Sequence, residues 1–253
     1  MNRTICFLLL TFLLPTICLT SKKVGSNKTY TFKLDTLNLF DTLRSRKIPI
    51  AIYGNTNDNA KIVIFSHGYG QNRGGDYLAY SYLTDYLASK GYFVISIQHE
   101  LATDSLMPLT GIAQVVRRRF WERGADNIMF TINELKKSNP KLDFKHIALI
   151  GHSNGADMTA LFPQKYPGIV DKIITFDNRR LALPRTTNPK IYSLRSCDQP
   201  ADEGVLPTDE ELKKFQITIV RLANTKHNDM DDNGNKNQHK EINYYVLKFL
   251  NEK

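Results

Sequence analysis

The sequence has little cysteine and only one long apolar run. Its 253 residues include three cysteines, and two of these, Cys6 and Cys18, lie in the N-terminal apolar segment. Cys197 stands alone in the rest of the chain, so we expect no intramolecular disulfide. A single apolar run excludes a protein that crosses a membrane several times, and 42% hydrophobic residues exclude a disordered or collagen-like chain. The composition is that of a globular protein.

The N-terminal apolar run has the pattern of an export signal. Arg3 supplies a basic start, an apolar stretch interrupted by Pro15 follows, and Thr20-Ser21-Lys22-Lys23 is polar again. A spanning helix would need about 20 apolar residues without a central proline. We therefore predict a signal peptide over residues 1–20, cleaved between Cys18 and Ser21. The mature protein would be secreted or periplasmic, with no stable membrane anchor.

The positive charge of the chain does not single out a partner. The formal net charge is +9, and residues 1–20 contribute one cation and no acid, so the mature protein would carry +8. The cations are scattered along the sequence, whereas nucleic-acid and membrane-surface patches usually come as basic clusters. We expect no nucleic-acid partner.

Short apolar runs alternate with segments of helical periodicity from Lys61 onward, which is typical of βαβ units and a mostly parallel sheet. The expected strands cover residues 62–65, 93–97, 147–150, 172–176, 191–194 and 217–220. The expected helices cover residues 77–90, 112–137 with a break near Gly124, 154–165, 209–215 and 240–250. Residues 30–34 and 48–53 are predicted to form an antiparallel edge pair. Without linkers or repeats, residues 21–253 are predicted to form a single α/β domain with helices on both faces of the sheet.

A serine between two glycines follows the strand expected over residues 147–150. Gly151-His152-Ser153-Asn154-Gly155 is a G-x-S-x-G sequence placed between a strand and a helix. The two glycines allow a sharp turn, and the helix N-terminus favours a developing negative charge. Ser153 is therefore the predicted nucleophile.

A serine hydroxyl needs a histidine base, and the base needs a carboxylate. Of the six histidines, His227 follows the last expected strand, where the chain order Ser, Asp, His places the base; His239 is second. Asp177, Asp198 and Asp202 each follow a strand. We predict Asp198, which follows the penultimate strand.

Asp202 remains an alternative acid, whereas the arginines next to Asp177 favour an ion pair there. Cys197, next to Asp198, is expected to pack under the catalytic loop.

The oxyanion hole would use the backbone N–H groups of Asn154 and of Tyr69, in the loop Ser66-His67-Gly68-Tyr69-Gly70.

These features resemble the α/β-hydrolase superfamily, and within it the dienelactone-hydrolase-like branch that also contains platelet-activating-factor acetylhydrolases. Besides the serine turn, the resemblance rests on Arg44-Ser45-Arg46-Lys47-Ile48-Pro49-Ile50, Phe65-Ser66-His67-Gly68-Tyr69-Gly70, Leu87-Ala88-Ser89-Lys90-Gly91-Tyr92 and Gln98-His99. It implies a three-layer α/β-hydrolase fold with Ser153, Asp198 and His227 as the triad and Tyr69 and Asn154 as oxyanion donors. True dienelactone hydrolases have a cysteine at the position of Ser153. Only residues 178–190 separate two strands where a cap would be inserted, so no large cap domain is expected.

The sequence thus predicts an exported serine hydrolase that cleaves small-molecule carboxylic esters through an acyl-enzyme, without a metal or other cofactor. A peptidase or amidase would use the same triad. A binding protein that kept the fold without the activity is the alternative of a different class.

Overall fold

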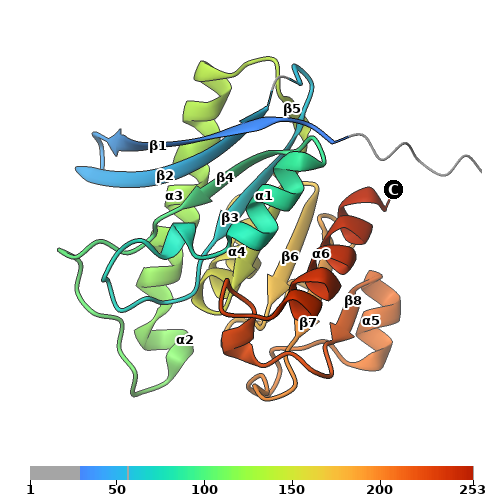
Figure 1. Cartoon of the computed structure of the whole chain (residues 1–253). Helices are drawn as coiled ribbons and strands as arrows, with labels where there is room; N and C mark the ends of the chain where they lie inside the picture. The colour runs from blue at the N-terminus through green and yellow to red at the C-terminus, as the bar shows by residue number, and fades with distance from the viewer. Residues whose placement is uncertain (1–28, 56, 253) are drawn as a thin grey trace, which may run out of the picture.

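The computed structural model describes residues 29–55 and 57–252, which contain an eight-stranded sheet (Figure 1). The strand order is β1-β2-β4-β3-β5-β6-β7-β8. The strands are β1 (Phe32–Asp41), β2 (Arg46–Asn55), β3 (Lys61–Ser66), β4 (Phe93–Ile97), β5 (Asp143–His152), β6 (Lys172–Phe176), β7 (Lys190–Arg195) and β8 (Thr218–Arg221). From β4 to β8 all neighbours are parallel. The signal peptide predicted over residues 1–20 lies outside the described residues.

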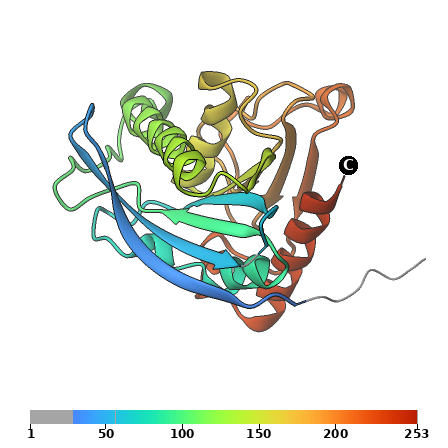
Figure 2. The same cartoon turned by 90° about the horizontal axis from the view of Figure 1, so that it is seen from above.

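The parallel strands are buried on both faces, which explains their continuous apolar sequences. In β3, Ile62 and Ile64 point into one apolar cluster, whereas Val63 and Phe65 point into the other. This alternation follows from the two-residue period of a strand. Helices α3 (Arg118–Ser138) and α4 (Asn154–Lys165) cover the first face, and α1 (Ser81–Ser89) and α6 (Lys236–Asn251) cover the second, as Figure 2 shows. The predicted three-layer arrangement is confirmed.

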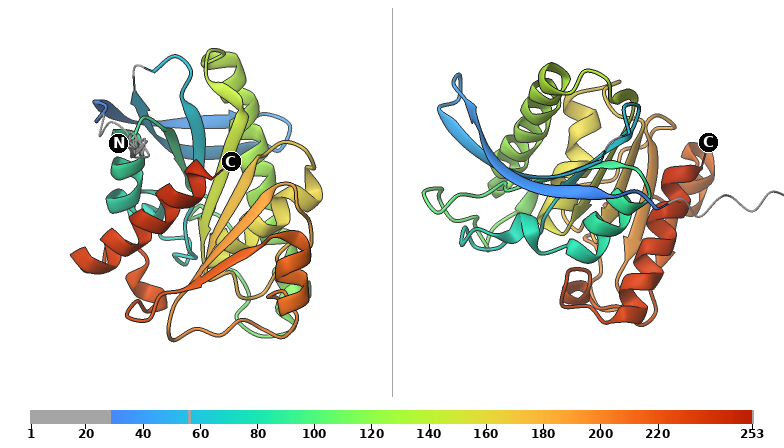
Figure 3. Two further views of the ribbon diagram at one scale, coloured as in Figure 1. Left: turned by 90° about the vertical axis from the view of Figure 1, so that its right-hand side faces the viewer. Right: turned by 45° about the horizontal axis from the view of Figure 1, so that its top comes forward.

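The expected edge pair is present and longer than predicted. β1 and β2 are antiparallel, with Leu34 opposite Tyr53, and they continue to a turn after Asp41. β2 in turn pairs antiparallel with β4, so the hairpin extends the sheet. Figure 3 shows this hairpin curving across the edge of the sheet.

The helices match the expected positions, with differences at their N-termini. α1 begins at Ser81 because a separate 3-10 turn covers Asp76–Leu78. The helix expected from residue 112 is divided into α2 (Ala113–Val116) and α3, but α3 continues through Gly124. A Cβ at Gly124 would lie 2.2 Å from the Met158 sulfur, so this glycine lets α3 pack closely on α4.

Local capping explains where the two C-terminal helices, α5 and α6, begin. α5 (Asp209–Phe215) has the predicted bounds and begins with a capping box between Thr208 and Glu211. α6 begins at residue 236 because Asn235 and Gln238 form another capping box. Within the described part of the chain, no helix has the length and apolar content needed to span a bilayer.

Candidate active site

Ser153 occupies the sharp turn between β5 and α4. Its backbone has φ 53° and ψ −116°, a conformation that is costly for a residue with a side chain. The turn is held to the neighbouring strand because the Ser153 N–H donates to the Phe176 carbonyl at 2.8 Å. A Cβ at Gly151 would lie 2.3 Å from the Gly155 carbonyl oxygen, and one at Gly155 would lie 2.2 Å from the Ser66 carbonyl oxygen. Both flanking positions therefore require glycine, as the sequence motif predicts.

His227 lies between Ser153 and a buried carboxylate. It begins the 3-10 turn His227–Asp229 that follows β8. Its Nε2 is 3.0 Å from Ser153 Oγ, and its Nδ1 is 2.9 Å from Asp177 Oδ2. A carboxylate only accepts, so Nδ1 carries the proton and Nε2 accepts from the serine hydroxyl. Ser153 and His227 are thus brought together as expected.

The choice of Asp198 as the carboxylate next to the histidine ring is wrong. Asp198 is exposed and accepts from the backbone N–H of His227 at 2.8 Å, so it holds the main chain of the histidine rather than its ring. Asp177 follows β6, which is the immediate neighbour of β5, and it has a positive φ of 52°. This backbone turn sets the Asp177 side chain one strand away from Ser153, whereas Asp198 lies three residues beyond β7.

Asp177 is buried and ionised. Its Oδ1 accepts from the Ser196 N–H at 2.8 Å and lies 3.4 Å from Arg195 Nε. Burial raises the pKa of Asp177, but the His227 hydrogen bond, the Arg195 charge and the Ser196 N–H outweigh it and hold that pKa below its ordinary value. A fixed negative charge here stabilises a positively charged imidazole on His227.

The other sequence candidates have different partners. Asp202 pairs with Arg180, so the arginines next to Asp177 do not take that carboxylate as the sequence reading supposed. The His239 ring stacks on the Tyr82 ring, with 3.9 Å between the two ring centroids. Cys197 is exposed rather than packed under the catalytic loop, and its backbone N–H donates to the Thr225 carbonyl at 2.9 Å.

His152, the variable residue of the serine turn, lies against the site without competing as a base. Its ring is buried and its centroid is 4.6 Å from that of His227. Tyr80 Oη accepts from the Gly68 N–H at 3.1 Å and is hydrogen-bonded to His152 Nδ1 at 2.8 Å. Burial lowers the pKa of His152 to about 3, so this ring is neutral. No sequence pattern pointed to Tyr80, which comes from the turn before α1.

The loop after β3 passes beside the nucleophile. A Cβ at Gly68 would lie 3.5 Å from Ser153 Cβ. The Gly68 N–H is used by Tyr80, whereas the N–H groups of Tyr69 and Asn154 have no acceptor among the described residues. The Tyr69 side chain is fixed because its Oη accepts from the Met107 N–H at 2.9 Å. Two free N–H donors beside a serine are what an oxyanion hole requires.

The described residues contain no cluster of three or more histidine, cysteine or acidic side chains that could hold a metal ion. The side chain within hydrogen-bond distance of Ser153 Oγ is that of His227. This arrangement can activate a hydroxyl and stabilise a negative charge on a substrate.

Comparison with known proteins supports the fold. No family model and no curated protein sequence matches this chain. Among solved structures, a putative dipeptidyl aminopeptidase IV from Bacteroides ovatus has a TM-score of 0.61 at 17% identity, over 86% of this chain and 36% of its own. One of two esterases from Rhizomucor miehei has a TM-score of 0.61 at 16% identity, over 87% of this chain and 82% of its own. A putative epoxide hydrolase from Pseudomonas aeruginosa has a TM-score of 0.56 at 12% identity, over 86% and 95%.

The chain thus has the α/β-hydrolase fold, as the sequence resemblance implied, and residues 177–189 between β6 and β7 leave no room for a large cap. It spans about a third of the length of the Bacteroides peptidase. These likenesses do not single out the dienelactone-hydrolase-like branch.

Proposed function

We propose that this protein is an exported serine hydrolase that cleaves small-molecule carboxylic esters through an acyl-enzyme. The observation that carries the proposal is the continuous hydrogen-bonded chain from Ser153 Oγ through His227 to Asp177. Ser153 is half-buried and so remains open to a substrate, whereas Asp177 is fully buried. This combination is the working arrangement of serine hydrolases on unrelated folds.

Each step of ester cleavage has a residue of this chain to perform it. His227 Nε2 takes the hydroxyl proton as Ser153 Oγ attacks the ester carbonyl, and Asp177 stabilises the imidazolium. The N–H groups of Asn154 and Tyr69 bind the oxyanion. His227 then gives the proton to the leaving alcohol, which leaves the acyl group on Ser153. Water attacks this acyl-enzyme with His227 again as base, and the acid is released.

Esters are favoured over peptides by the open surroundings of the site. No large cap covers the serine, and the segment after β4 presents the exposed apolar side chains of Leu106 and Leu109 next to Met107, which contacts Tyr69. These side chains suit an apolar acyl or alcohol group. This chain covers 82% of the esterase from Rhizomucor miehei, but only 36% of the peptidase from Bacteroides and 41% of an acylaminoacyl peptidase from Pyrococcus horikoshii.

An active-site probe tests this proposal. A fluorophosphonate should label the wild-type chain on Ser153 and should not label Ser153→Ala. The same preparations should then be compared on activated esters and on peptide amides. Faster cleavage of the amides would favour the peptidase alternative, and absence of labelling of the folded wild-type protein would favour the non-catalytic binding protein.

Export is proposed from the N-terminal sequence alone. Met1 to Thr20 combine a basic start with a short apolar run, so we propose cleavage near residue 20 and a secreted or periplasmic mature protein. N-terminal sequencing of the protein isolated from the native cells tests this, because an intact Met1 on the mature chain would contradict it.

A further inference from the structure

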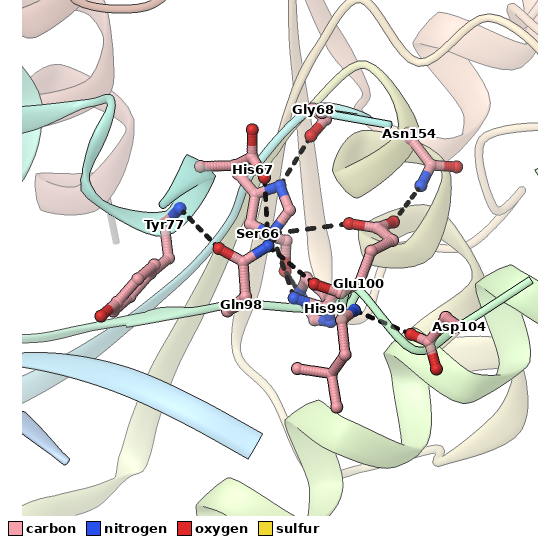
Figure 4. Close-up of polar contacts among 12 residues, drawn as sticks. Ser66, His67, Gly68, Tyr77, Gln98, His99, Glu100, Asp104 and Asn154 are labelled. Carbon is pink, nitrogen blue, oxygen red and sulfur yellow. Dashed lines mark hydrogen bonds and ion pairs between the residues drawn. The ribbon is translucent and has the colours of Figure 1, made fainter. Parts of the chain in front are cut away.

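A cluster of buried polar side chains lies directly behind the proposed oxyanion hole (Figure 4). Ser66 and His67 come from the end of β3, His99 and Glu100 from the residues after β4, and Asn154 from the start of α4. Each of the five is at most 5% exposed. Their hydrogen bonds therefore link the three segments that surround Ser153.

His67 is neutral, as its two hydrogen bonds require. Its Nδ1 is 2.6 Å from the Gly68 carbonyl oxygen, which can only accept, so Nδ1 carries a proton. Its Nε2 accepts from the backbone N–H of His99 at 3.0 Å, so Nε2 carries none. His67 is therefore held at both nitrogens in one tautomer, and the loop that continues to Tyr69 is held with it.

Glu100 lies between this loop and the nucleophile turn. Its Oε1 accepts from Asn154 Nδ2 at 2.8 Å, and its Oε2 faces His67 Nε2 at 3.6 Å with no hydrogen bond of its own. Because Nε2 has no proton, the contact is not a charge pair. A proton on Oε2 removes the repulsion between the two acceptors and leaves the bond to Asn154 intact.

Burial outweighs the neighbouring charges at Glu100. Burial raises the pKa of Glu100, and the nearby cations Arg46 and Arg123 pair with Asp104 instead. His99 is itself neutral, because burial lowers its pKa well below the ordinary value. Burial thus shifts Glu100 towards its neutral form.

Asn154 is fixed from both ends of its side chain. Its Oδ1 accepts from the indole N–H of the fully buried Trp121 at 2.9 Å, while its Nδ2 donates to Glu100. The backbone N–H of this residue is one of the two proposed oxyanion donors. Its side chain thus sets the orientation of the peptide that must bind the oxyanion.

We propose that Glu100 is a positioning residue that holds the two halves of the oxyanion hole in register, by binding Asn154 on one side and facing His67 on the other. This inference rests on the proposed function. Glu100 touches neither the substrate nor Ser153; it acts through the placement of the Asn154 and Tyr69 N–H groups.

The test separates transition-state binding from substrate binding. We expect Glu100→Ala to lower kcat for an activated ester by about 10- to 100-fold, less than the roughly 100- to 1,000-fold cost of losing an oxyanion donor. KM should change little, and the affinity for butylboronic acid, whose tetrahedral adduct occupies the oxyanion hole, should fall by a similar factor. Glu100→Gln, which mimics the neutral acid, should restore most of kcat.

Asn154→Ala provides a second variant if Glu100→Ala does not fold. The two changes share the Glu100–Asn154 contact, so the double variant should lose less kcat than the product of the two single losses. Asp126→Asn is the matched control, because Asp126 accepts from Tyr166 away from the site; its kinetics should equal wild type.

The proposal would be overturned if Glu100→Ala had the kcat and boronate affinity of the wild type, or if its only change were a rise in KM. It would also be overturned if Glu100→Gln were as impaired as Glu100→Ala. Failure of the proposed function is seen separately, because the wild-type chain itself would then resist fluorophosphonate labelling and leave the ester intact.

Discussion

Arg195 Nε lies 3.4 Å from Asp177 Oδ1, on the side of the carboxylate away from His227. Arg195 is the last residue of β7. The strand end after which the sequence predicts the triad acid thus carries a cation. Its guanidinium also donates to the Asn178 carbonyl at 2.7 Å and to the Gln199 carbonyl at 3.3 Å. Arg195 therefore fixes the charge of Asp177 and the loops on either side of it.

Arg195→Met should weaken the site in a pH-dependent way. Arg195 places a positive charge beside the coupled Asp177–His227 pair, so its loss favours protonation of the pair, and the acidic limb of the kcat/KM profile should move to higher pH. The unpaired carbonyls should also cost about 1–3 kcal/mol of unfolding free energy. Arg195→Lys keeps the charge and should leave the acidic limb closer to wild type. Superimposable profiles for wild type and Arg195→Met would refute this role.

Asp157 should make the stability of the protein fall as pH rises from about 4 to 6. This buried carboxylate of α4 accepts from the N–H groups of Arg179, Arg180 and Leu181, but burial outweighs these bonds and raises its pKa to about 6. The pKa of Asp157 in the folded state exceeds its unfolded value of 3.8, so the folded state binds this proton more tightly than the unfolded state does. The stability that proton binding adds is lost as the pH rises through the folded pKa.

Asp157→Asn keeps an oxygen acceptor and removes the ionisation. Chemical unfolding of both proteins between pH 4 and pH 7 should give a stability difference that shifts in favour of the variant by about 2 kcal/mol as pH rises, since one pKa unit is about 1.4 kcal/mol and part of the shift lies below pH 4. A difference independent of pH would show that Asp157 does not titrate abnormally.

Tyr80→Phe should reduce both stability and activity. Tyr80 Oη binds the Gly68 N–H and His152 Nδ1, and its removal leaves both groups buried and unpaired. We expect a loss of about 1–3 kcal/mol in urea unfolding and a lower kcat, because Gly68 precedes a proposed oxyanion donor. Tyr244→Phe is the control, since Tyr244 is 61% exposed and should change neither quantity. An unchanged urea midpoint for Tyr80→Phe would argue against the bridge.

Cys197 should react rapidly with a thiol reagent in the folded mature protein. Its exposure predicts one accessible thiol, whereas packing under the catalytic loop would protect it until unfolding. Titration with an aromatic disulfide before and after adding denaturant checks this. A thiol that appears only in denaturant would restore the sequence-based expectation.

The strand series, the serine turn and the base follow from local sequence. Apolar runs mark β3 to β7, the glycines around Ser153 are required by contacts below 2.5 Å, and His227 follows the last strand. These features depend on short-range patterns, since buried parallel strands and sharp turns constrain the residues that form them.

The acid could not be predicted in the same way. Asp177, Asp198 and Asp202 all follow strands, and the choice depends on the backbone turn at Asp177 and on a buried arginine from another strand. Glu100 and Tyr80 were missed for a related reason. They reach the site through hydrogen bonds across 54 and 72 residues of sequence, and no periodicity records such contacts.

The most direct measurement of the central claim is kcat/KM for an activated ester in Asp177→Asn and Asp198→Asn, with both proteins shown to be folded. We expect Asp177→Asn to lose about 1,000- to 10,000-fold, because the His227 ring loses its ionised partner. Asp198→Asn keeps an oxygen for the His227 backbone N–H and should stay within about 10-fold of wild type, since it affects only placement of the histidine. Near-normal turnover in Asp177→Asn together with loss of activity in Asp198→Asn would contradict the triad.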